Sequence, residues 1–526
     1  MVLFENCQFE GAFGGTEATL AAAVKVKGRS RVSFERCRFQ NNDTHLQIEE
    51  NSLCELRQSS LREARADGIL VTGRATIVAG ELEISNSGWS ALSLSNDASS
   101  QISNSKFTSN GCHGLELKDQ SSHRGSRNTF STNSQHGVSL NDSSDLLSVG
   151  ASFLENTLCG VDFGGHSSGL LRDCDSTGNK NHGVQLRGSS RIHLVETSTM
   201  ENGASGLTLF DKASVQAEDL HSENNTFSGI QTADSSRVNL SRGNVALNGS
   251  SGILACFKSS LNIEKSRIFD SGGYGIQSSD QAQISVRDCE VFENQRGGII
   301  VAGNSQAFVQ ASTLVGNLVD GFVSTDRSRA TLMENLVRDN KRDGILLLSS
   351  GLGQFFGNQC LGNLRHGIFA ANGSKPLIAE MTSADNGHGQ IVLETTLVRS
   401  AQGKPAVSKE LSTETLSGVT ISVEDGPELR LPFEPKKLEK SMLCALAKHG
   451  RLSEAALGKV AKTRRVGGAM ENLIARLNQA GMPFIRHDGD GPEGNIYTFK
   501  LDTTRLRVPP TNNSQKTTHT QRRETC

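Results

Sequence analysis

A glycine recurs at every twenty-third position in the middle of this chain. Thirteen of the fourteen slots between Gly68 and Gly367 hold glycine, and Ala91 fills the other, although glycine supplies only 54 of the 526 residues. A second column, four residues earlier, holds asparagine from Asn110 to Asn386 with Ser271 as its one exception. A repeat of constant length without insertions indicates identical structural units stacked in register.

Within each unit the apolar residues alternate with polar ones, which is the period of a β-strand and not of a helix. Leu115 and Leu117 follow one repeat glycine, Ile192 and Leu194 form a pair later in their unit, and a third segment ends near Phe107. Three short strands per repeat, separated by Ser, Asp, Gly and Asn, predict a three-sided parallel β-helix with one coil per repeat.

The two columns should have mechanical roles. We expect the glycine to open the first strand at a point where the turn leaves no room for a Cβ atom. We expect the asparagine to adopt the left-handed backbone conformation and its amide to bond the next asparagine in a ladder. The copies are looser near the start, where residues 2–9 resemble residues 32–39 and should stack on them.

On these columns the chain resembles the pectate-lyase-like parallel β-helix repeat family over residues 1 to about 400. The resemblance implies a right-handed β-helix. The family includes enzymes that cut or epimerise polysaccharides, repeat proteins related to copper or carbohydrate, and F-box adaptors. Because the repeated positions are structural, the resemblance specifies the fold and hardly constrains the activity.

The pattern ends after Gln390, which predicts four regions. Residues 1–398 should form the β-helix, 399–435 an irregular cap and linker, 436–502 a winged-helix domain and 503–526 a disordered basic tail. The sequence is thus predicted to be mostly β, with a small α+β domain at its end.

The winged-helix prediction rests on the order of elements. Helical periodicity predicts helices beginning near Leu438, Ser453 and Val466, followed by a two-stranded ribbon around the turn at residues 488–494. Three helices and a hairpin resemble a winged helix-turn-helix, with the third helix as the reader and the hairpin as the wing.

Charge separates the two parts of the chain. Residues 436–502 carry a net charge of +5 and residues 503–526 carry +4, whereas residues 1–435 carry −11. This balance favours DNA or an acidic partner at the C-terminal end. The residues expected to make that contact are Lys459, Lys462, Arg464, Arg465, Asn472 and Arg476. The acidic wing, with Asp488 and Asp490, would repel a phosphate backbone, so protein docking stays open as the alternative.

A possible ligand face follows the first strand of the coils, where Glu116, Lys118, Asp162 and Arg187 should point outward. Glu116 and Asp162 should lie two coils apart, roughly 10 Å at about 4.8 Å per coil. This is slightly beyond the ~6.5–9.5 Å of inverting glycosidases. No catalytic residue is assigned, since the repeat has no inserted loops and the chain has only two Tyr and one Trp.

Histidines recur just before the repeat glycine, at His113, His136, His182 and His366. Stacked imidazoles could share a metal ion. Since Cys159, Ser205, Ser228, Tyr274 and Asp320 fill the same slot, we interpret it as a polar turn position and predict no metal and no cofactor.

In the later coils the outward column changes from polar to apolar residues, at Ile300, Val323, Leu346 and Phe369. A contiguous apolar stripe on a water-facing surface usually marks an interface. We expect either the segment after residue 390 or an external partner to cover it.

These features together favour a non-catalytic interaction scaffold, whose β-helix recognises a partner and whose basic domain binds DNA or another protein. A polysaccharide-active enzyme and a carbohydrate-binding repeat remain the alternatives. The chain shows no signal peptide and no apolar run of about 18 residues. Its eleven cysteines lack paired spacing. Both features are expected of a cytoplasmic protein with reduced thiols and no membrane partner.

Overall fold

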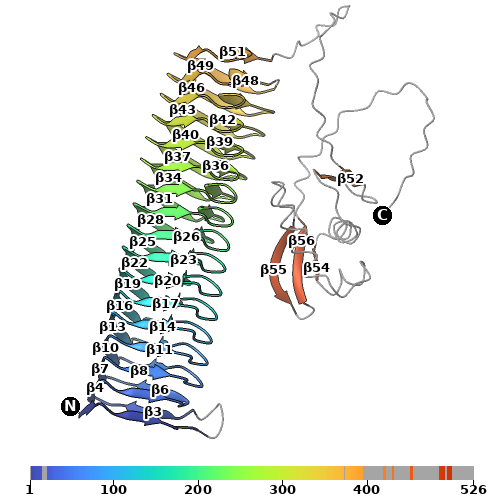
Figure 1. Cartoon of the computed structure of the whole chain (residues 1–526). Coiled ribbons are helices and arrows are strands. Elements are labelled where there is room, and N and C mark those ends of the chain that lie inside the picture. Colours follow the sequence, from blue (N-terminus) through green and yellow to red (C-terminus); the bar gives the residue numbers. More distant parts are fainter. Residues whose placement is uncertain are drawn as a thin grey trace, which may run out of the picture. The chain divides into compact units, whose positions relative to one another are not determined.

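The computed structural model describes residues 2–14, 20–371 and 373–394, together with the backbone of five further strands between residues 419 and 499. The chain divides into two units, residues 1–398 and 399–526. In the first unit, three strands per coil pair in parallel with those of the neighbouring coils (Figure 1). They form three sheets of 17 strands each, here called A, B and C. The predicted three-sided parallel β-helix is therefore confirmed.

The strand bounds follow the 23-residue period. Sheet A contains β1 (Val2–Glu5), β4 (Arg31–Glu35) and β7 (Leu53–Arg57), and then a five-residue strand every 23 residues from β10 (Thr76–Gly80) to β49 (Lys375–Ala379). Sheet B contains β2 (Gln8–Glu10), β5 (Arg38–Gln40) and β8 (Ser60–Arg62), and then a three-residue strand every 23 residues from β11 (Glu83–Ser85) to β50 (Thr382–Ala384). Sheet C contains β3 (Ala22–Val26) and β6 (Thr44–Ile48), and then a three-residue strand every 23 residues from β9 (Ile69–Val71) to β33 (Ile253–Ala255). Its last strands are β36 (Tyr274–Ser278), β39 (Gly297–Val301), β42 (Asp320–Ser324), β45 (Ile345–Leu347), β48 (His366–Ala370) and β51 (Gly389–Leu393).

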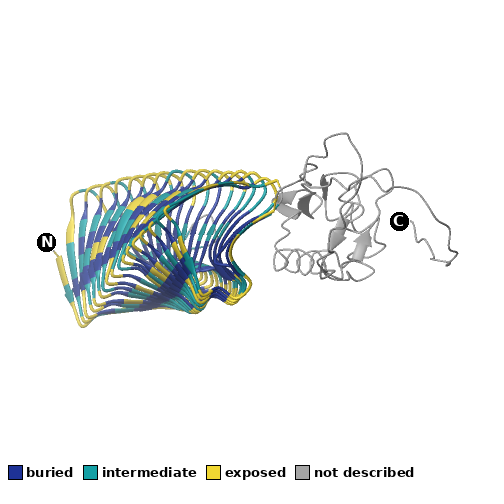
Figure 2. Ribbon diagram, turned by 90° about the horizontal axis from the view of Figure 1, so that it is seen from above, coloured by how far each residue is buried: buried dark blue, intermediate teal, exposed yellow. Residues whose placement is uncertain are grey.

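The core is a column of apolar side chains enclosed by the three sheets, and Figure 2 shows buried residues along the inside of the coils. Because alternate strand residues point inward, each interior position meets its equivalent one coil away. Phe107 and Phe130 stack with ring centroids 4.8 Å apart, and Phe130 and Phe153 with centroids 5.5 Å apart. Residues 2–5 pair with residues 32–35, as their similarity predicts.

The asparagine column forms the predicted ladder in the turn from sheet B to sheet C. Asn179 donates its Nδ2 hydrogen to Asn202 Oδ1, and Asn202 donates to Asn225 Oδ1, both at 3.0 Å. The predicted left-handed backbone, however, was assigned to the wrong residue. The residue before each asparagine adopts it, for example Thr132 with φ 52° and Glu155 with φ 53°. The ladder bonds offset the cost of holding such residues in a sparsely populated conformation.

The glycine column is explained by space, as predicted. A Cβ atom on Gly114 would lie 2.6 Å from the carbonyl oxygen of Gly137 and 3.0 Å from Asn133 Nδ2. Any larger residue must therefore push against the backbone of the next coil.

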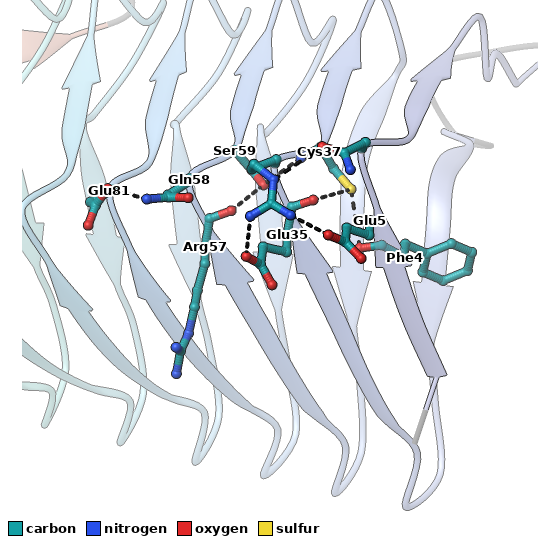
Figure 3. A network of polar contacts seen from close by, with 10 residues as sticks. Phe4, Glu5, Glu35, Cys37, Arg57, Gln58, Ser59 and Glu81 are labelled. Carbon is teal, nitrogen blue, oxygen red and sulfur yellow. Dashed lines mark hydrogen bonds and ion pairs between the residues drawn. The ribbon is translucent and has the colours of Figure 1, made fainter.

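The short turn from sheet A to sheet B also joins successive coils. Gln58 Nε2 donates to Glu81 Oε2 at 2.9 Å, and the Cys37 amide donates to Ser59 Oγ at 3.0 Å (Figure 3). The Ser59 hydroxyl in turn donates to the carbonyl oxygen of Arg57 at 2.8 Å. The Gln58 and Cys37 bonds thus join neighbouring coils, and the Ser59 bond closes the turn within one coil.

The second unit is described only through five strands. β52 (Val419–Ile421) and β53 (Leu429–Leu431) form an antiparallel ribbon in the segment predicted to be irregular. Its apolar residues do alternate, but over three residues only, too few for periodicity to detect. β54 (Arg451–Ser453), β55 (Ile485–Gly491) and β56 (Gly494–Phe499) form an antiparallel sheet in which β55 and β56 are the expected ribbon.

Ser453, predicted to begin a helix, belongs to β54. The three predicted helices lie outside the described residues, so the winged-helix domain stays a prediction. Within the described ranges, no helix is long and apolar enough to cross a membrane. The nine cysteines found there are all free thiols.

Candidate functional site

The outer face of sheet C holds the predicted ligand residues in the predicted register, since Glu116 pairs with Ser139 and Ser139 with Asp162. The four charged residues nevertheless form two internal pairs. Lys118 Nζ lies 2.7 Å from Glu116 Oε1, and Arg187 forms an ion pair with Asp162. Asp162 also accepts a 2.8 Å hydrogen bond from Gln185 Nε2 and is buried. These residues therefore hold neighbouring positions together, and the ligand face stays a prediction.

The predicted apolar stripe is also in register, because Ile300 pairs with Val323, Val323 with Leu346 and Leu346 with Phe369. The expectation that it faces water is wrong for its middle. Val323 is 4% exposed and Leu346 is 2% exposed. Each is flanked in the row by a large apolar side chain one coil away on both sides. Ile300 and Phe369 are half-buried.

The histidine column forms a further ladder, which the sequence did not indicate. The Nδ1 atom of His113 accepts the main-chain hydrogen of His136 at 3.3 Å, and His136 Nδ1 accepts that of Cys159 at 3.1 Å. His182 Nδ1 accepts the Ser205 amide in the same way at 3.2 Å. Among the described residues, no group of three or more side chains could hold a metal ion.

Several histidines of the β-helix are buried in their neutral form. Burial lowers the pKa of His113, His123 and His182 to about 4 each. An unfolded histidine holds its proton below about pH 6.5. Each buried histidine therefore stabilises the fold fully above that pH and loses its contribution as the pH falls from 6.5 towards 4. Burial raises the pKa of Asp67 to about 7. This carboxyl stabilises the fold in its protonated form, so its contribution to stability is lost as the pH rises towards 7.

We expect the His123→Leu variant to be less sensitive to acid than the natural chain. His123 is fully buried, its Nδ1 is 2.8 Å from Ser100 Oγ, and its Nε2 has no partner. Between pH 6.5 and 4 the natural chain should lose about 3 kcal/mol more unfolding free energy than the variant, at 1.36 kcal/mol per pKa unit. Urea titrations at several pH values would measure this, with pH 7.5 as the reference. The prediction would be contradicted if the unfolding free energies of the natural chain and the variant fell equally between pH 6.5 and 4.

The later coils carry a charged cluster at the turn that leads from sheet B into sheet C. Asp320, Asp343 and His366 occupy the same repeat position in successive coils, and all three are buried. Asp320 Oδ1 accepts the Asp343 amide at 3.0 Å, and Asp343 Oδ1 accepts the His366 amide at 3.1 Å. Arg342 lies against both carboxylates, with its Nε atom 3.2 Å from Asp320 Oδ1 and 3.6 Å from Asp343 Oδ2.

The imidazole of His366 differs from those of the earlier histidines. Its Nδ1 atom lies 2.7 Å from the Asp343 Oδ1 atom, whereas the Nδ1 atoms of His113 and His136 accept main-chain hydrogens. Burial raises the pKa of Asp320 to about 6, and burial together with Asp320 raises the pKa of Tyr274. A Cβ atom on Gly297 would lie 3.0 Å from Tyr274 Cε1 and 2.8 Å from the Asp320 carbonyl oxygen. The cluster thus brings a phenol, carboxyls and an imidazole to one side of the coils.

Above the buried carboxylates, the same turns present apolar and basic side chains to solvent. Leu318 is 45% exposed and Leu364 is 62% exposed. The side chains of Arg342 and Arg365 are 41% and 40% exposed, and Lys341, one coil from each leucine, is exposed as well. We call these five residues the ridge.

Only a weak pattern in the sequence indicates this site. The sequence identifies Asp320 only as one of several residues at a polar turn position. The available signal was aspartate in two successive copies of a slot that most often holds Ser or His, with arginine before Asp343 and His366. The predicted contact residues of the C-terminal domain lie outside the described residues: Lys459, Lys462, Arg464, Arg465, Asn472 and Arg476.

Comparison with known proteins places the coils in a family. The family model described as "Right handed beta helix region" matches residues 22–170, 149–286 and 278–400. The chain belongs to this family. No curated protein matches it.

Three solved structures align with this chain at 11–12% identity. The A-module of a mannuronan C-5 epimerase from Azotobacter vinelandii is 11% identical, with 69% of this chain and 90% of that chain covered and a TM-score of 0.32. A periplasmic alginate epimerase is 12% identical, with 66% and 77% covered and a TM-score of 0.33. The structure of a Vag8–C1 inhibitor complex is 11% identical, with 73% and 99% covered and a TM-score of 0.46.

Proposed function

We propose that the protein is a non-catalytic interaction scaffold whose β-helix docks a partner protein through the ridge. The observation that carries this proposal is the exposure of Leu364 and Leu318 beside the half-exposed side chains of Arg342 and Arg365. Arginine is one of the residue types enriched at the energetic centres of protein interfaces. Exposed apolar side chains that lie together and are rimmed by polar residues mark interaction surfaces, whereas isolated exposed leucines mean little.

Charge complementarity indicates the kind of partner. The ridge carries three cations, of which Arg342 and Arg365 also lie within ion-pair distance of the buried carboxylates of Asp320 and Asp343, whereas Lys341 is exposed. Asp339, next to the ridge, is already paired with Arg338 at 2.9 Å. A protein segment that combines acidic and large apolar side chains would match both features of this surface.

The hydrogen bonds of the cluster favour binding over catalysis. Asp320 Oδ1 and Asp343 Oδ1 both accept main-chain hydrogens from the next coil, so these carboxyls hold successive coils together. A general acid or base must instead reach the proton of a bound substrate. A polysaccharide-active enzyme remains the alternative, because Tyr274 and the His366–Asp343 pair provide groups able to transfer protons.

We expect a displayed peptide library, panned on the full chain, to select segments rich in acidic and large apolar residues. The Leu364→Asp/Arg365→Gln variant should bind the selected peptides at least about tenfold more weakly, which corresponds to about 1.4 kcal/mol. The matched control is Leu158→Asp/Lys180→Gln, at exposed positions of the same turn in earlier coils. Fluorescence polarisation would measure the affinities.

Two outcomes would contradict this function. Equal loss of binding in the two double variants would show that the ridge has no special role. Release of new products from uronan or glucan polymers, abolished by Asp320→Asn, would favour the enzyme.

A further inference from the structure

Two cysteines occupy the same turn position, between sheets A and B, in the first two coils of the β-helix. Because β1 and β2 pair in register with β4 and β5, Cys7 and Cys37 are equivalent residues one coil apart. The Arg38 amide donates to the Cys7 carbonyl oxygen at 2.8 Å, which holds the two backbones together at this point. Neighbouring coils stand about 4.8 Å apart, and disulfide bonds join Cα atoms about 4.4–6.8 Å apart. The turn therefore places the two Cα atoms within the range that a disulfide requires.

The two thiols have the same orientation. The residue before each cysteine adopts the left-handed backbone conformation, with φ 54° in one coil and 53° in the other. Each Sγ atom donates to the carbonyl oxygen two residues earlier, at 3.4 Å in both coils. The Sγ atom of Cys37 also lies 3.5 Å from the carbonyl oxygen of Phe4, in the coil that carries Cys7 (Figure 3). Burial raises the pKa of the Cys37 thiol, and the Cys7 thiol raises it further, as expected of neighbouring sulfur atoms.

Arg36 holds the two turns in place beside the thiols. Its guanidinium group forms ion pairs with Glu5 in the first coil and with Glu35 in the second. Its Nε atom donates to Asn6 Oδ1 at 3.2 Å, again across the two coils. The two sulfur atoms can therefore be joined with little movement of the main chain.

Among the nine cysteines in the described part of the chain, no other two occupy equivalent positions of neighbouring coils. Cys174 and Cys289 lie at the same turn position in later coils, where the coils on either side carry Ala, Thr or Ser instead. These two thiols are internal controls for the turn without a stacked partner.

We propose that Cys7 and Cys37 are a redox modification site, at which oxidation forms a disulfide bond that fastens the first coil to the second. The oxidant is a small disulfide such as oxidised glutathione. Cys7 is partly exposed and Cys37 is buried, so the Cys7 thiolate attacks first and releases one glutathione. The Cys37 thiolate then attacks the Cys7 sulfur and displaces the second glutathione. Two protein thiols are thus oxidised to one disulfide, while one small disulfide is reduced to two thiols that take up the two protons.

The bond would change the stability of the first coil. Val2 pairs with Val32, so the bond would close a loop longer than the 23-residue step of later coils. Closing a loop restricts the unfolded chain and stabilises the folded coil. Hydrogen exchange of the main-chain amides of β1 and β2 should therefore be at least about tenfold slower in the oxidised chain than in the reduced chain. The proposal concerns turns remote from the ridge and does not depend on the protein-docking function.

The test uses the full chain, equilibrated at pH 8 in glutathione buffers of increasing oxidised fraction and quenched with an alkylating reagent. Digestion after glutamate residues, without reduction, should give one linked product, residues 6–10 joined to residues 36–49. Mass spectrometry would measure this product together with the modification of Cys174 and Cys289. The control variant is Cys37→Ser, which should fold because Ser59 and Ser105 fill the same turn position.

We expect at least about half of the natural chain to carry the linked product in a buffer that leaves Cys174 and Cys289 reduced. Cys37→Ser should acquire glutathione at Cys7, and its exchange in β1 and β2 should not slow. The proposal is overturned if Cys7 and Cys37 carry separate glutathione adducts, or if they stay reduced together with the two controls. It is also overturned if Cys7 links to another cysteine, or if the linked chain exchanges as fast as the reduced chain.

Discussion

Replacing Val184 by aspartate is expected to cost at least about 4 kcal/mol of unfolding free energy, because it buries a charge that has no partner. Val184 is fully buried and stands between Val161 and Leu207 in the interior row of sheet C. Because each coil contacts only its neighbours, the substitution should also weaken the coupling between the coils that precede Val184 and those that follow it. Urea unfolding followed by circular dichroism would measure both the midpoint and the cooperativity.

Two control variants separate this effect from a general intolerance of substitution. Val184→Ile matches the isoleucine that later coils carry at Ile230 and Ile253, so it should change stability by less than about 1.5 kcal/mol. Arg191→Asp places an acid at an exposed position of the same coil and should be nearly neutral. A Val184→Asp protein as stable as the natural chain would contradict the inward orientation of this row.

The Asn202→Ala variant is expected to lose roughly 3 kcal/mol, because it deletes four buried hydrogen bonds at once. Asn202 Oδ1 accepts from the amide and from Nδ2 of Asn179, at 3.1 and 3.0 Å. Its Nδ2 donates to the Ser176 carbonyl oxygen and to Asn225 Oδ1, both at 3.0 Å. No water can replace these bonds without entering the buried turn.

Asn202→Ser is the matched comparison, since Ser271 fills the same column naturally. The Ser271 hydroxyl donates to the carbonyl oxygen of Phe269 at 3.4 Å, so a serine keeps one side-chain hydrogen bond that an alanine cannot form. Thermal and urea unfolding should rank the natural chain above Asn202→Ser and Asn202→Ser above Asn202→Ala. Equal stability of serine and alanine at this position would mean that the side-chain bonds contribute little.

The fold was predictable because its determinants repeat. Each glycine and asparagine of the columns performs the same task in the same place, so position and spacing identify the coil without knowledge of distant contacts. The residue that adopts the left-handed backbone conformation was not predicted, because its identity changes from coil to coil. Ser109, Thr132, Glu155 and Leu247 all adopt it, so the conformation follows from the turn and not from one residue type.

The outward faces were harder to predict, because burial there depends on neighbours in the next coil. Asp162 is buried by Gln185 and Arg187, which approach it from the following coil. Leu346 is buried within a row whose other members are also large. Alternation alone assigns such residues to the outside of a strand, and it carries no information on what covers that side.

Because nearly every coil contains 23 residues, the length of the β-helix is set by the number of coils. From β10 onward, each ladder bond joins a residue to its equivalent 23 positions along the chain, so the gain or loss of one whole coil leaves each remaining bond with a partner of the same kind. A change of another length must be accommodated within a turn, as in the first coils, where Val2 pairs with Val32. The axial spacing between two binding surfaces on this unit can therefore change only in increments of about 4.8 Å.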